Sequence, residues 1–363
     1  MNRQPEPRFR TELRDDGTGP GTGHTAGDVP PGVDLGLLFP IRRPFPRARW
    51  LIGLAILTVL LVGFWACGVF SSEPDPAGGT SWGPPLFFSV VIAYIVPIFG
   101  YICERTFTAI NALTPLLDAD AERIEAWRSR VRTKPRAWFI IVVLIGIASG
   151  TAHNLLLNGT PLALLEQAGR SVAAASVAVG VQLVWMVFTL VVAGLLDNAL
   201  LLNRLARHAR IRILDTSRLR PFATVAVLST LALIGAQAAF PIMTLEGGID
   251  PLAYIPGLLA TSVPMVIIAA LPVWPVHRRL MAQKRAILDD LNRRIGETPL
   301  PDPDATESLA AIAPLLTYRR EVAQASEWPF DVGVMTRLAL YLIIPPLTWV
   351  GAALIEHVVE TFL

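Results

Sequence analysis

Seven long runs of apolar residues alternate with polar connections along the chain. Each run has about 20 residues, which is the length that a helix needs to cross the roughly 30 Å hydrocarbon core of a bilayer. The connections between the runs carry nearly all of the charge. The pattern therefore predicts an all-α, polytopic helical membrane protein with seven transmembrane helices. The runs are 50–70, about 85–103, 137–157, about 172–196, 222–243, 252–276 and about 338–359.

The basic residues of the connections predict the orientation of the chain. All but one of the 31 Lys and Arg residues lie in the N-terminal tail or in the connections between runs two and three, four and five, and six and seven. The exception is Arg170, between runs three and four. Because cytoplasmic connections are enriched in Lys and Arg, we expect the N-terminus to be cytoplasmic and the C-terminus to lie outside.

The polar segments predict the domain organisation. Residues 1–49 are rich in Pro, Gly and charge and lack the apolar start of a signal peptide, so we expect a disordered basic cytoplasmic tail. Residues 50–363 form the membrane domain, with cytoplasmic helical segments at 104–136 and 277–335. In the first segment a helix-start signal at Thr114 precedes a polar helix. The second segment has two helical stretches around a Pro-rich turn, which predicts a cytoplasmic helical hairpin.

Two of the cytoplasmic stretches resemble segments of known proteins. These are LDTSRLRPF (214–222) and YRREVAQASEWPFD (318–331), followed by the run that holds adjacent prolines. They resemble a group of bacterial multi-pass membrane proteins over the second half of the chain. No activity is attached to that group, so the resemblance implies a helical membrane protein and nothing catalytic. Seven spans with a cytoplasmic N-terminus is also the topology of insect chemoreceptor channels, but no motif matches them.

The composition of the chain predicts its cellular compartment and argues against disulfide or metal chemistry. Only Lys134 and Lys284 are lysines among the basic residues, an Arg bias typical of a GC-rich bacterial genome, so we expect the bacterial inner (plasma) membrane. Cys67 and Cys103 fall near opposite sides of the bilayer and are not expected to pair. We expect no cofactor and no metal.

The sequence carries no signature of a known catalytic site. It has no H-E-x-x-H, P-loop or G-x-S-x-G motif. Ser149 and His153 share a helix face in the third run, which could be imagined as a nucleophile–base pair. An intramembrane serine protease takes these two residues from different helices, however, so we prefer a His that is satisfied by a neighbouring helix or by water. The protein is not expected to be an enzyme.

Small residues four apart mark two of the runs. They are Gly146 and Gly150 in the third run, and Ser176 and Gly180 in the fourth. This spacing lets helix backbones approach closely. We expect the two runs to pack on each other or on a second subunit.

Prolines and polar groups inside the runs are the candidate ligand or pore residues. A proline removes a backbone donor, so the freed carbonyl needs a neighbour or a water-filled cavity, and broken helices recur at transporter sites. The alternatives are a packed kink for the prolines, an interfacial ion pair near Arg204 for Asp197, and exposure at the outer surface for a Glu-His pair in run seven. His153 and Glu356 could also meet in an outer vestibule. The candidates are Pro345, Pro346, Pro264, Pro272, His153, Glu356, His357, Asp197 and Asn198.

Two functions remain open from the sequence. The first is permeation of an ion or small solute through a channel-like bundle that uses the broken runs six and seven, with a homo-oligomer as the expected assembly. The alternative is a non-catalytic membrane sensor or scaffold whose cytoplasmic helices bind a partner. The other expected partners are membrane lipids, with anionic headgroups at the Arg-rich cytoplasmic face. Nucleic acid is not an expected partner.

Overall fold

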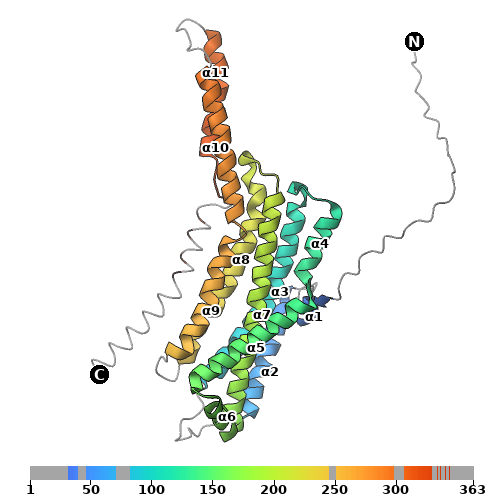
Figure 1. Ribbon diagram of the computed structural model, residues 1–363, viewed down its shortest axis with the longest axis vertical. Coiled ribbons are helices and arrows are strands. Elements are labelled where there is room, and N and C mark those ends of the chain that lie inside the picture. The colour runs from blue at the N-terminus through green and yellow to red at the C-terminus, as the bar shows by residue number, and fades with distance from the viewer. Residues whose placement is uncertain are drawn as a thin grey trace, which may run out of the picture.

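A computed structural model of the protein describes residues 32–39, 46–70, 82–244, 251–297 and 306–328, together with four single positions beyond them. Helices dominate these residues and form an elongated bundle (Figure 1). A two-stranded sheet is the remaining regular element of the described chain.

Six helices of the described chain are long and apolar enough to cross a membrane. They correspond to the first six predicted runs, so the described residues are compatible with a multi-pass membrane protein. The seventh predicted run, 338–359, lies outside the described residues apart from Leu340 and Ile343. The helices are α2 (Pro46–Ala66), α3 (Gly83–Leu113), α5 (Arg136–Asn158), α7 (Val172–His208), α8 (Arg220–Gln237) and α9 (Pro251–Ala270), the last continuing after a break into α10 (Trp274–Glu297).

Shorter elements cap the two ends of the bundle. We call the end that carries α4, η2, α10 and α11 the arginine-rich end. The short helix α6 lies at the other end (Figure 1). The remaining elements are η1 (Thr114–Leu116), α4 (Ala121–Arg132), β2 (Thr133–Pro135), α6 (Pro161–Arg170), η2 (Ile213–Leu219), η3 (Phe240–Thr244) and α11 (Thr306–Gln324).

The polar helix after α3 begins later than the sequence predicted. Thr114 starts the 3-10 turn η1, which ends α3, and α4 begins only after Asp120. The chain between them is held extended, because Leu117 forms a β-bridge with Ala209 after α7. A pairing with a segment some 90 residues away therefore overrides the local helix-start signal.

Part of the predicted disordered tail is ordered. Residues 32–34 form strand β1 (Gly32–Asp34), which pairs antiparallel with β2, and helix α1 (Leu35–Leu38) follows. Leu35 and Phe39 are buried in the hydrophobic core, and the Phe39 ring lies edge-on to Phe99 of α3 at 4.6 Å. Burial of these two side chains offsets the loss of chain entropy on ordering. Residues 1–31 lie outside the described residues.

Helices α5 and α7 pack closely through Gly146 and Gly150 of α5, whereas Gly180 of the second small-residue pair faces Phe64 of α2 and Phe88 of α3. A Cβ built on Gly146 would lie 2.8 Å from Cα of Met186, and one on Gly150 would lie 2.9 Å from the Gln182 amide. The Gln182 side chain donates to the carbonyl of Ile147 at 3.0 Å. The two runs therefore pack on each other, which was one of the two predicted arrangements.

The proline inside α3 leaves a carbonyl that a neighbouring helix covers. Pro97 has no N–H, so the carbonyl of Ala93 loses its usual helical donor. A Cβ built on Gly53 of α2 would lie 2.7 Å from that oxygen. Glycine at position 53 thus lets the α2 backbone lie directly against the freed carbonyl.

At the break between α9 and α10, a side chain of α7 bonds to a carbonyl that has lost its helical donor. Pro272 lies in the break, and Pro275 in the first turn of α10 cannot donate to the carbonyl of Leu271. The side chain of Asn203 donates to that carbonyl at 2.7 Å. The break is therefore a defined structural joint that is fastened to α7.

Candidate functional site

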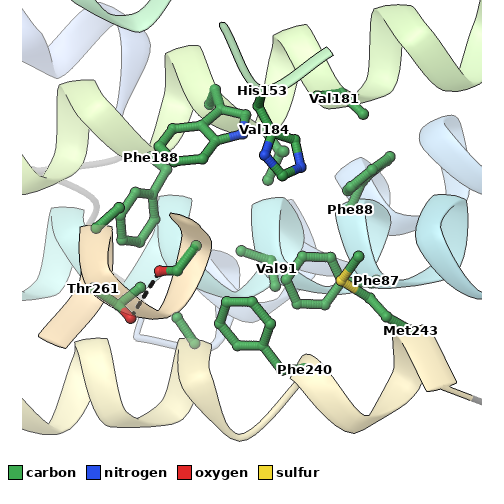
Figure 2. A pocket seen from close by; sticks show the side chains of 14 residues that line it. Phe87, Phe88, Val91, His153, Val181, Val184, Phe188, Phe240, Met243 and Thr261 are labelled. Atoms are coloured by element: carbon green, nitrogen blue, oxygen red, sulfur yellow. Dashed lines mark hydrogen bonds between the residues drawn. The ribbon is translucent and has the colours of Figure 1, made fainter. Parts of the chain in front are cut away.

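The principal candidate site is a pocket between α3, α5, α7, α8, η3 and α9 (Figure 2). It lies in the half of the bundle nearer α6, because His153 in its lining is in the last turns of α5, shortly before α6 begins. The cavity has a volume of about 60 Å³. We call it the His153 pocket. Its lining residues are Phe87, Phe88, Val91, His153, Val181, Val184, Trp185, Phe188, Ala236, Phe240, Met243, Gly257, Ala260 and Thr261.

The walls of the pocket are apolar and rich in aromatic rings. The Phe87 ring lies 4.9 Å from the Phe240 ring and 5.9 Å from the Phe88 ring. Trp185 and Phe188 line the α7 side. None of the fourteen described lining residues is charged. A charge without a partner is costly in such surroundings, so the pocket suits an uncharged molecule.

His153 is the most polar group in the pocket. Its side chain is 8% exposed, and Figure 2 shows the imidazole among the lining side chains. The ring centre lies 5.5 Å from that of Trp185. Within the described chain, its buried Nδ1 has no hydrogen-bond partner. Leaving a buried polar group unpaired costs about 1–3 kcal/mol, so the pocket has a polar atom that a ligand would satisfy.

Thr261 carries the one hydroxyl among the described lining residues, and this hydroxyl already has hydrogen-bond partners. Its hydroxyl accepts from the Gln237 amide at 2.7 Å and donates to the Leu258 carbonyl at 2.9 Å. The same amide also donates to Ser262 at 2.8 Å. These bonds join α8 to α9 along one side of the pocket.

A second polar cluster lies at the arginine-rich end, around Asp197 of α7. Its carboxylate is paired with the ammonium group of Lys134 and, at 2.9 Å, with Arg130. Lys134 is 1% exposed, and it also donates to the Arg130 carbonyl at 2.8 Å. Asp197 was expected to pair with the nearby Arg204, but the partners of its carboxylate come from α4 and β2. These ion pairs hold α4 and β2 against α7.

Asn198 faces the interior beside this cluster. Its side chain donates to Sγ of Cys103 at 3.7 Å, and both residues are buried. Cys103 and Cys67 are both free thiols. In the described ranges, no group of three His, Cys, Asp or Glu residues is placed to hold a metal ion.

The remaining candidates from the sequence lie elsewhere. Pro264 lies inside α9 and Pro272 in the break that follows it, and neither lines the pocket. Ser149 does not line the pocket either. Four candidates fall outside the described residues, together with the suggested meeting of His153 with run seven. They are Pro345, Pro346, Glu356 and His357.

The sequence did not identify the aromatic lining of the pocket. Phe87, Phe88 and Phe240 lie at the ends of apolar runs, where a pocket residue and a lipid-facing residue look the same. Trp185 lies near the middle of run four, eleven residues before its end, and gives no signal of its own. These residues meet because three separate elements, α3, α7 and η3, bring them together, which no local pattern encodes.

The α10–α11 hairpin is closed at its base into one unit. The His277 ring stacks on Trp328 with ring centres 3.9 Å apart and planes at 12°. Lys284 donates to the Ala325 carbonyl at 3.0 Å and to Glu327 at 3.2 Å. Arg279 donates to the Ala206 carbonyl of α7 at 2.6 Å, so the hairpin base is tied to the same helix that fastens the α9–α10 break.

Comparison of the chain with protein-family models, with curated proteins and with solved structures finds no match.

Proposed function

We propose that this is a membrane sensor, which binds a small, membrane-soluble molecule in the His153 pocket and transmits the bound state to the α10–α11 hairpin. The observation that carries the proposal is the course of α9. Gly257, Ala260 and Thr261 of α9 line the pocket, and the same helix ends at the break from which α10 begins. A shift of α9 at the pocket therefore has a direct mechanical route to the hairpin.

Helix α7 is the element relative to which α9 would shift. It lines the opposite wall of the pocket through Val184 and Trp185, and farther along it holds the break through Asn203 and the hairpin base through the Ala206 carbonyl. A ligand that changes the separation of α7 and α9 would strain the contacts that α7 makes at the break between α9 and α10. Hinge motions commonly use a few residues at the ends of elements in this way.

The arginine-rich end is proposed to be cytoplasmic, in a bacterial inner membrane, with its basic side chains near anionic headgroups. The pocket then opens in the outer half of the bundle and the hairpin projects into the cytoplasm, where it would meet a partner. The permeation hypothesis depends on Pro345 and Pro346, which lie outside the described residues, so it stays a prediction.

The proposal is tested by filling the pocket without a ligand. Val184→Trp places a large ring in the pocket, and Val179→Trp, five residues earlier on the same helix, places it on a surface that is 65% exposed. Spin labels at Glu122→Cys on α4 and Ala282→Cys on α10, in a Cys67→Ser, Cys103→Ala background, report the distance between hairpin and bundle in nanodiscs.

We expect Val184→Trp to shift that distance by about 2 Å or more, on the scale of helix shifts in known switches, and Val179→Trp to leave it unchanged. Both variants are compared at equal thermal stability. An unchanged distance distribution in a folded Val184→Trp protein would show that the pocket does not communicate with the hairpin.

A further inference from the structure

The polar atoms of the His153 pocket indicate which ligand it takes; this inference rests on the proposed function of the pocket. Thr261 both donates and accepts within the protein. Asn154, beside His153, faces α7 and donates to the Ala178 carbonyl at 3.3 Å. Of the described lining residues, His153 is the one that holds a buried polar side-chain atom without a partner. A ligand that fits the pocket therefore has an oxygen or nitrogen that can bond to an imidazole.

The walls indicate the shape of the rest of the ligand. Rings from α3, α7 and η3 line the space, and those of α3 and η3 contact one another at 4.9–5.9 Å in tilted and edge-on arrangements. Aromatic pairs favour such offset and edge-on geometries at 4.5–7 Å, so a planar ring entering the pocket would gain the same contacts. A saturated chain would bury apolar area in the pocket, but it would not form these aromatic contacts.

The absence of charge in the lining and the outer surface of α9 indicate how the ligand arrives. An ionised headgroup would find no countercharge among the described lining residues. The face of α9 turned away from the bundle is apolar, with Leu259 and Val263 both more than half exposed. A compound dissolved in the bilayer would reach the pocket along such a surface without leaving apolar surroundings.

We infer that the His153 pocket binds a neutral ring compound that bears a ring carbonyl or hydroxyl, of the quinone or phenol class, with that oxygen hydrogen-bonded to His153. A lipid acyl chain would leave His153 unpaired, and a charged amphiphile would bury its charge. Quinones and phenols satisfy the imidazole, match the aromatic walls and dissolve in membranes.

The inference is tested with two compounds that differ only in the ring oxygens. Duroquinone carries four methyl groups and two carbonyls, and its full substitution prevents reaction with cysteine. Durene has the same ring and methyl groups without the oxygens. Binding of each to the full-length protein in nanodiscs is measured by equilibrium dialysis, relative to protein-free nanodiscs, so that partition into lipid is removed.

We expect the wild-type protein to prefer duroquinone by about tenfold, the ratio that one hydrogen bond to a buried group supplies. His153→Phe keeps the ring and removes the nitrogens, so the preference should fall to about one. His208→Phe is the matched control, because His208 also lies beside a tryptophan, with ring centres 5.7 Å apart, but far from the pocket. It should leave the preference unchanged.

Equal binding of the two compounds by the wild-type protein, no binding of either, or a preference that survives His153→Phe would each overturn the ligand class. The wild-type comparison needs no variant, so it stands even if His153→Phe fails to fold. These outcomes are separate from the proposed function, because the spin-label experiment uses no compound. A hairpin shift on Val184→Trp without quinone binding would keep the sensor and reject this ligand.

Discussion

His153 and Lys134 are both polar residues buried in a largely apolar bundle, but their surroundings differ. Lys134 has a carboxylate and a backbone carbonyl as partners, and its ammonium group lies 5.7 Å from the centre of the Trp138 ring. His153 has an aromatic neighbour, and within the described chain its Nδ1 has no partner. A fully paired buried charge serves architecture, whereas an unpaired polar atom at a pocket offers a binding contact. This contrast is why we assign only His153 a ligand.

The role of Lys134 leads to a prediction about Asp197. Asp197→Ala would leave the Lys134 ammonium buried without a carboxylate, so we expect the free energy of unfolding to fall by about 3–5 kcal/mol. Chemical unfolding in detergent micelles measures this loss. Arg204→Ala, at an exposed position on the same helix, is the control and should change stability by no more than about 0.5 kcal/mol.

Comparable losses in Arg204→Ala and Asp197→Ala would support the pairing that the sequence suggested, and the observed cluster would be wrong. The sequence placed Asp197 near the end of its helix but not its partners. Arg204 lies two turns away on α7, whereas Lys134 lies more than 60 residues away and reaches Asp197 only because α4 and β2 fold back onto α7.

At the scale of elements, packing depends on positions without side chains. Gly146 and Gly150 bring α5 against α7, and Gly53 brings α2 against the carbonyl that Pro97 frees. The sequence predicted close packing of the two small-residue runs, because spacing alone places the glycines on one face. It could not choose between a neighbouring helix and a second subunit, since both present the same surface.

The α5–α7 contact leads to the next prediction. Gly146→Leu would force a side chain into Met186, whose Cα lies 2.8 Å from the position of the new Cβ. We expect a loss of about 1–3 kcal/mol in unfolding free energy, typical of overpacking. Gly63→Leu is the control, since a Cβ there meets no described atom within 4 Å and would face lipid. If both variants unfold alike, the glycines do not mediate the contact.

Two elements show where local patterns fall short. Helix α6 begins with Thr160, whose hydroxyl accepts from the N–H of Ala163 at 3.1 Å, and with proline in the first helical position. That capping signal is present in the sequence, but ten residues are too few to register as a span. Strand β1 has no local signal, because its order depends on pairing with β2.

At the scale of the whole molecule, the sequence predicted six of the observed long helices, because lipid demands continuous apolar runs. The same demand hides the pocket, since lipid-facing and pocket-lining residues are both apolar. The long helices, the orientation of the chain and the seventh span therefore rest on different kinds of evidence. The six helices are observed, while orientation and the seventh span stay predictions.

The sensor account depends on one arrangement: the pocket half and the hairpin half of the molecule must face opposite sides of the bilayer. Single cysteines in the Cys67→Ser, Cys103→Ala background report this directly. Gln167→Cys lies on α6, Ala282→Cys lies on α10, and Val62→Cys on the lipid-facing side of α2 is the control that should stay unlabelled.

A membrane-impermeant maleimide is applied to intact cells and then to lysed cells. We expect Gln167→Cys to be labelled in intact cells, because the proposed orientation puts α6 outside, and Ala282→Cys to be labelled only after lysis, because the same orientation puts the arginine-rich end in the cytoplasm. Labelling of both positions from the same side, or of Ala282→Cys alone in intact cells, would contradict the account, since no signal from an outward pocket would then reach a cytoplasmic hairpin.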